Sequence, residues 1–239
     1  MDDVTILLQG NVKQEVLDFF LLYYPSQKIV ISTWFEHVHL TFPKDTDEIP
    51  KDMKLIQSKL PDNLKRYNVY YQLVSTVNGL KHVDTKYVLK IRGDEFVSRL
   101  DYVLELMTSD PDRIFTSPVF FKKWSKMTYH ISDHMIAGTT DNIKMMFEGA
   151  KHDYDMNLFD NVTYIPEQVI TLSYLKRKAH VANFGTADGV KLMKDHFGIL
   201  DLSKMIPYKI VANCFKKEWY SNFVAADNDS ITKIEDVEG

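Results

Sequence analysis

The chain has 239 residues, of which 45% are hydrophobic and 26% are charged, so it can bury one large α/β core without disulfides. Its formal charge of −4 lacks the basic excess of nucleic-acid-binding proteins, and we expect no nucleic-acid partner. A single cysteine, Cys214, excludes an internal disulfide and favours a reducing compartment. No apolar run approaches the roughly 18 residues of a membrane span, so we expect a cytoplasmic protein without a transmembrane segment.

The first part of the chain predicts strands alternating with helices. Short apolar runs predict three strands, at residues 4–9, 28–34 and 87–92. Apolar side chains at helical spacing predict two helices, at residues 13–24 and 64–82. This β-α-β order requires parallel strands joined by right-handed crossovers. We therefore predict an α/β fold with a Rossmann-like, mostly parallel sheet and helices on both faces.

The rest of the chain is less regular. Residues 49–60 are compatible with a strand or a short helix. Further helices are predicted at residues 100–107, 141–149 and 169–175, the last opened by Pro166, and a strand at 113–117. We expect one domain over residues 1–224, followed by an acidic, flexible tail over 225–239. The sequence indicates no oligomeric state.

Two carboxylates follow the strand at 87–92 directly, after Gly93. Ligands of parallel sheets gather beyond the carboxyl ends of the strands, so Asp94 and Glu95 are expected at the mouth of a site. Two acids there can bind a hard divalent cation such as Mn²⁺ or Mg²⁺. The same triplet is also typical of a turn followed by the start of a helix.

A second acidic position, Asp133, is followed by His134 in a segment that ends at Gly138. A carboxylate beside an imidazole offers either a general base or a pair of metal ligands. The alternative is a local hydrogen-bonded turn.

The predicted helix at 64–82 carries a polar, uncharged stripe that consists of Asn68, Gln72, Ser75 and Gly79. Such a stripe faces a polar ligand, a buried network or solvent. Farther along, Phe120, Phe121, Trp124 and Tyr129 alternate with lysines. This pattern suits a sugar or phosphate pocket as well as a basic surface strand or flap.

Taken together, several short motifs resemble, in order, those of the WavE family of lipopolysaccharide-synthesis proteins. They extend over roughly residues 4–175 and comprise Leu7–Gly10, Ile31–Trp34, Asn68 to Leu80, Lys86–Asp94, Ile131–Asp133 with Gly138, and Pro166–Gln168. The resemblance implies a GT-A-type glycosyltransferase that uses a nucleotide-sugar donor (a UDP-, GDP- or dTDP-sugar) and a glycan or polysaccharide acceptor. It also implies Mn²⁺ or Mg²⁺ held by an acidic turn.

The resemblance assigns roles to particular residues. The turn at Gln9 and Gly10 would approach the nucleotide base, and Asn68, Gln72 and Ser75 would bind ribose or sugar hydroxyls. Arg92 would balance phosphate charge or fix Asp94. The catalytic base would be Asp133, with Glu167 as the second candidate. The turn has Gly93-Asp94-Glu95 in place of Asp-x-Asp, so Asp94 is the main predicted metal contact and a metal-independent reaction is the alternative.

Two other functions compete with this hypothesis. A sugar-phosphate nucleotidyltransferase also binds phosphate and metal, but its glycine-rich, lysine-bearing loop is missing after residue 9. A catalytically silent domain that binds a nucleotide or glycan is favoured by the incomplete acidic motif. The presence of Asp94, Asp133 and Glu167 favours an enzyme over a silent domain.

Overall fold

The computed structural model describes residues 3–37, 40–41, 52–60, 69–119, 121–159, 164–180, 186–205, 208–210 and 233–238. The strands are β1 (Val4–Gln9), β2 (Lys28–Trp34), β3 (Met53–Ser58), β4 (Tyr87–Arg92), β5 (Glu95–Val97), β6 (Ile114–Thr116), β7 (Met135–Thr139), β8 (Phe197–Ile199) and β9 (Tyr208–Ile210). The α-helices are α1 (Gln14–Tyr23), α2 (Val69–Leu80), α3 (Leu100–Ser109), α4 (Thr140–Asp155), α5 (Pro166–Lys178) and α6 (Thr186–His196). The 3-10 helices are η1 (Phe35–His37), η3 (Leu202–Lys204) and η5 (Ile234–Glu238).

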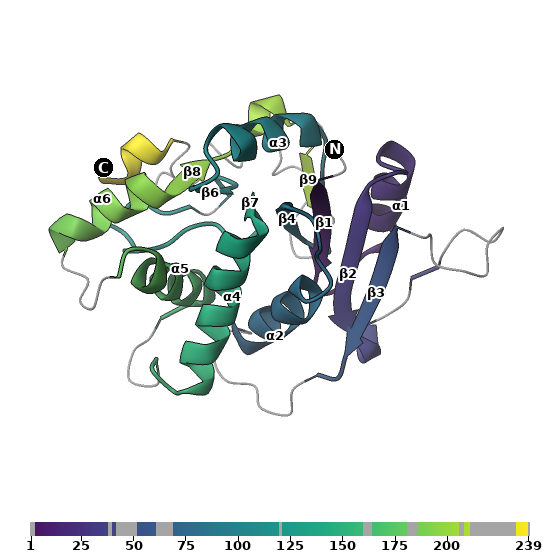
Figure 1. Cartoon of the computed structure of the whole chain (residues 1–239), viewed down its shortest axis with the longest axis horizontal. Helices are drawn as coiled ribbons and strands as arrows, with labels where there is room; N and C mark the ends of the chain where they lie inside the picture. The colour runs from purple at the N-terminus through teal and green to yellow at the C-terminus, as the bar shows by residue number, and fades with distance from the viewer. Residues whose placement is uncertain are drawn as a thin grey trace.

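Seven strands form one sheet in the order β3-β2-β1-β4-β7-β6-β8, and β5 pairs with β9 in a separate two-stranded sheet (Figure 1). The first four strands are mutually parallel, and β6 and β8 are parallel to each other. Only β7 runs antiparallel to both of its neighbours in this sheet. The predicted α/β class with a mostly parallel, Rossmann-like sheet is therefore confirmed.

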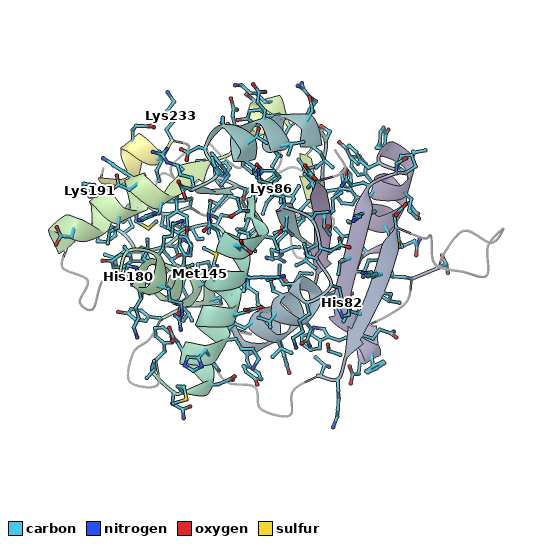
Figure 2. The ribbon with its side chains drawn as sticks, viewed as in Figure 1. His82, Lys86, Met145, His180, Lys191 and Lys233 are labelled. Atoms are coloured by element: carbon cyan, nitrogen blue, oxygen red, sulfur yellow. The ribbon has the colours of Figure 1, made fainter. Side chains whose placement is uncertain are left out.

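Alternate side chains of the strands enter two different cores. In β1, Leu7 faces one core while Ile6 and Leu8 face the other, as expected from the period of two in a strand. Helices α2, α4 and α5 pack on the side of Leu7, and α1 and α3 pack on the opposite side (Figures 1 and 2). Because both faces are covered, β1 and β4 are apolar along most of their length.

The structure differs from the sequence prediction at several elements. The ambiguous stretch at residues 49–60 contains the parallel strand β3, which adds to the edge of β2. After the acidic turn comes the strand β5 before the helix α3 begins. The helix α6 and the strand β8 were not predicted, because short apolar runs mixed with charge obscure their periodicity.

The predicted tail at 225–239 is described only over residues 233–238. There Ile234 and Val237 are buried, and the carbonyl of Val237 accepts a hydrogen bond from the amide of Trp124 at 2.7 Å. The remainder of the tail and Cys214 lie outside the described residues. Within the described ranges, none of the helices combines the length and the apolar character needed to cross a membrane.

Candidate active site

The candidate site lies where the sheet reverses its strand order. From β1 the chain adds β2 and β3 on one side, and β4 then pairs with β1 on the other side. Open α/β sheets bind ligands beyond the carboxyl ends of the strands at such a point. Gln9 and Arg92 are paired residues at these ends. Because β7 is antiparallel, its start reaches the same edge, where the Arg92 amide donates to the His134 carbonyl at 3.1 Å.

Two glycines shape the backbone at this edge. Gly10 has φ of +91°, and a Cβ there would meet no atom within 4 Å, so the backbone is open on this side. Gly93 is crowded, because an added Cβ would lie 2.7 Å from Val12 Cα. Its amide donates to the Gln9 carbonyl at 2.7 Å, and its carbonyl accepts from the Lys13 amide at 2.8 Å. The turn after β1 and the acidic turn after β4 are thereby joined.

The three predicted metal ligands are held by other protein groups. Arg92 donates to both carboxylate oxygens of Asp94, at 3.1 and 3.0 Å, and its Nε lies 3.5 Å from Glu95 Oε1. The same Glu95 oxygen lies 2.5 Å from Nδ1 of His134, and both side chains are buried. No three His, Cys, Asp or Glu side chains in the described part of the chain come together as metal ligands. Asp94, Glu95 and His134 therefore bind other protein groups and do not form a three-residue metal cluster in the described part of the chain.

His134 and Glu95 form a buried ion pair. Burial lowers the pKa of His134, but the charge and the hydrogen bond of Glu95 together raise it by more than burial lowers it. The pKa of His134 therefore lies above its ordinary value. The imidazole is therefore biased toward its charged form. Together with Arg92, it places two cations beside the acidic turn.

Asp133 is held in its ionised form by its neighbours. Gln72 Nε2 donates to Asp133 Oδ2 at 2.8 Å, and the buried Lys90 donates from Nζ to the Asp133 carbonyl. Burial raises the pKa of Asp133, but the charges of Lys90, His134 and Arg92 lower it overall. A carboxylate with a lowered pKa is a weak proton acceptor, so Asp133 is poorly suited to be the base.

Glu167, the second predicted base, begins α5 and has the opposite character. Its Oε2 is buried and has no hydrogen-bond partner among the described residues. Burial, followed by the negative charge of Asp133, raises the pKa of Glu167 to about 7. The structure thus places Glu167 where the charge of Asp133 acts on it. A carboxylate whose pKa is near 7 is well matched to general base catalysis.

Sequence reasoning missed two buried basic side chains near Asp133. Lys90 lies in the middle of β4, and burial lowers its pKa. His130 is 4% exposed, its Nδ1 has no hydrogen-bond partner in the described ranges, and burial lowers its pKa to about 4. For Lys90, a lysine within an apolar strand pattern indicates a buried basic side chain. The sequence around His130 carried no comparable signal.

The polar stripe of α2 faces a buried network. Ser75 is fully buried, accepts a hydrogen bond from Gln9 Nε2 at 2.7 Å and donates to the Tyr71 carbonyl at 2.8 Å. A Cβ on Gly79 would lie 2.4 Å from Leu7 Cδ1, so the helix packs closely on β1. Gln9 and Ser75 thus bind each other inside the protein, whereas Gly10 and Arg92 remain partly accessible. Asn68 lies outside the described residues.

Comparison with known proteins assigns the family. No curated protein matches the chain. A family model described as WavE lipopolysaccharide synthesis matches residues 7–183, which include the carboxyl end of β1, all of β4 and the positions Asp133 and Glu167. This match covers more than half of the chain. The protein therefore belongs to the WavE lipopolysaccharide synthesis family.

Proposed function

We propose that the protein is a glycosyltransferase of GT-A type that transfers a sugar from a nucleotide-sugar donor to a glycan acceptor, with Glu167 as the catalytic base. Membership of the WavE family indicates a role in lipopolysaccharide synthesis. The observation that carries the proposal is the buried Oε2 of Glu167, which has no hydrogen-bond partner in the described part of the chain and belongs to a carboxyl with a pKa of about 7. A structural carboxylate would be expected to have a partner.

The donor is assigned to the edge where β1 and β4 diverge. Gly10 leaves the backbone open to a nucleobase or ribose, and Arg92, which is partly exposed although it also binds Asp94, is the cation assigned to a diphosphate. Support for this donor comes from the strand order and from β7, which runs antiparallel to both of its neighbours in the seven-stranded sheet and brings the acidic and basic groups to one edge.

The proposed reaction is a single displacement at the anomeric carbon. The oxygen of an acceptor hydroxyl forms a bond to this carbon, and its proton passes to the Glu167 carboxylate. The bond between the carbon and the diphosphate oxygen breaks, and the electron pair leaves with the nucleoside diphosphate, whose charge Arg92 balances. Asp133 remains ionised and keeps the pKa of Glu167 high. In this proposal Asp94 keeps its two hydrogen bonds from Arg92, and no step is assigned to a metal.

The test measures release of nucleoside diphosphate from UDP-, GDP- and dTDP-sugars. Glu167→Gln should lower turnover about 100-fold or more, because general base catalysis contributes at least this much. Glu148→Gln, an exposed position on α4, is the matched control and should be unaffected. In the wild type the rate should rise with pH through about 7, since only the ionised carboxylate accepts a proton.

The competing outcomes are separable. Full activity of Glu167→Gln would remove Glu167 from the reaction, and Asp133→Asn would then be the next base to test. A folded wild type that binds one of the nucleotides without turning over its sugar would instead favour the silent-domain alternative.

A further inference from the structure

A second polar and aromatic cavity lies outside the cluster around Asp133. It has a volume of about 330 Å³ and is formed by the segment before β7, the end of α4 and one face of α5. Its walls include two aromatic pairs, Trp124 with Tyr129 and Phe159 with Tyr164, whose ring centroids lie 4.6 and 6.0 Å apart. This volume is within the range of small-molecule sites.

The cavity is on the side of α5 away from the proposed base. Lys176, which lines it, follows Glu167 by nine positions, or two and a half helical turns, so the two side chains leave opposite faces of the helix. Gln168 Nε2 donates to the Thr128 carbonyl at 2.8 Å and ties the cavity wall to the start of α5. The cavity is therefore adjacent to the candidate active site but does not open from Glu167 itself.

Charged groups accompany the aromatic walls. Asp153 is 2% exposed and accepts two hydrogen bonds from Arg177, at 2.6 and 2.8 Å, while Lys176 is exposed. Asp153 is already bound by Arg177, so Lys176 at the rim is the charged group of the lining that a polar ligand can bind. A sugar ring suits both kinds of wall, because it has a face of C–H groups and an edge of hydroxyls.

We propose that this cavity binds a saccharide unit of a glycan, at a position remote from the hydroxyl that reacts. The aromatic rings contact the C–H face of the sugar, and Lys176 donates a hydrogen bond to a hydroxyl at the rim. The identification of this glycan as the acceptor rests on the proposed transferase function. The binding of a saccharide in the cavity does not depend on that function.

The experiment is ¹⁹F NMR of the full chain labelled with 5-fluorotryptophan. The chain has three tryptophans, of which Trp124 lies in the cavity, Trp34 ends β2 and Trp219 lies outside the described residues. Trp124→Phe assigns the resonance of the cavity. Cellobiose, maltose, lactose and chitobiose, each at millimolar concentration, are the probes. We expect at least one disaccharide to shift the Trp124 resonance while that of Trp34 stays in place.

Two variants locate the binding. Phe159→Ala and Lys176→Ala should each weaken the affinity for that disaccharide about tenfold, from loss of an aromatic contact and of a charged donor. Tyr23→Ala on α1 and Lys191→Ala on α6 are matched controls at exposed positions outside the cavity, and both should bind as the wild type does. Lys191 is labelled in Figure 2.

Three results would overturn the proposal: no shift with any of the four sugars, a shift of Trp34 alone, or equal affinity in the wild type and both cavity variants. A larger Trp124 shift with uridine than with any sugar would also overturn it. The titration needs no donor sugar. If the protein binds a disaccharide but shows no transferase activity, the saccharide site stands and only the proposed function is disproved.

Discussion

Burial moves the pKa values of Glu167 and His130 in opposite directions, because it disfavours the charged form of each group. Glu167 becomes a weaker acid, and His130 becomes a weaker base. Neither Oε2 of Glu167 nor Nδ1 of His130 has a hydrogen-bond partner in the described ranges. Nearby charges oppose burial, Asp133 at His130 and His134 at Glu167, but burial is the larger effect at both groups. Both groups therefore remain largely neutral at pH values at which they would be charged in the unfolded chain.

Glu167→Gln should stabilise the protein at high pH. The pKa of Glu167 is about 7 in the folded protein and 4.5 ordinarily, so the folded state binds more protons between these values and the free energy of unfolding falls as pH rises. At pH 8 the variant should gain up to about 3 kcal/mol over the wild type, at about 1.4 kcal/mol per pKa unit. Urea unfolding at pH 4 and pH 8 checks this, and an equal gain at both values would contradict it.

His130 should destabilise the protein in acid. Its pKa is about 4 in the folded state and 6.5 ordinarily, so the unfolded chain binds more protons in this window and stability is lost as pH falls from 6.5 toward 4. ¹H NMR titration, with the resonance assigned by His130→Gln, should give a pKa near 4 for this ring. A value near 6.5 would show that the imidazole is not held neutral by burial.

At the scale of elements, the antiparallel strand β7 assembles the site. No helix separates it from β6 among the described residues, it runs antiparallel to β4, and its start therefore meets the end of β4. This arrangement brings His134 to Glu95 and Asp133 to Lys90, although 39 and 43 positions separate them in the chain. The close approach of the turns after β1 and β4 then fixes the other side of the site.

The two glycines of these turns should respond differently to substitution. Gly93→Ala should cost about 1–3 kcal/mol, because its Cβ would lie 2.7 Å from Val12 Cα and the backbone must move. Gly10→Ala meets no atom and should cost only about 1–2 kcal/mol, from its positive φ, and Gly10→Asn should cost less. Urea unfolding measures all three. Val12→Ala should rescue Gly93→Ala only in part, because it removes the Cγ2 contact at 2.7 Å and leaves the Val12 Cα and amide nitrogen in place, so full rescue would contradict the argument.

At the scale of the whole molecule, ligand binding should appear as thermal stabilisation. A nucleotide at about one hundred times its Kd adds about 2.7 kcal/mol, which raises the melting temperature by several degrees in a chain of this size. We expect this from one of UDP, GDP or dTDP. Mn²⁺ alone should leave the melting temperature unchanged, because Arg92 holds Asp94 and His134 holds Glu95. A shift with Mn²⁺ alone that Asp94→Asn abolishes would restore the predicted metal site.

Much of the fold could be predicted from local patterns. The strands at Val4–Gln9, Lys28–Trp34 and Tyr87–Arg92 were predicted correctly, because short apolar runs, and the glycine that follows the first and the third of them, are properties of adjacent residues. The order of strands and helices was then sufficient for the α/β class. The orientation of β7 was not predictable, since no local pattern distinguishes a parallel from an antiparallel partner.

The sequence by itself determined which residues could form the site: carboxylates after a buried strand, an aspartate beside a histidine, and a glutamate at the start of a helix. Only the tertiary structure decided what each of them does. Asp94 is paired with Arg92, and the charge of Lys90 helps to keep Asp133 ionised. Burial and the charge of Asp133 raise the pKa of Glu167. The reason is physical: a pKa and a hydrogen-bond partner depend on burial and on charges from distant parts of the chain.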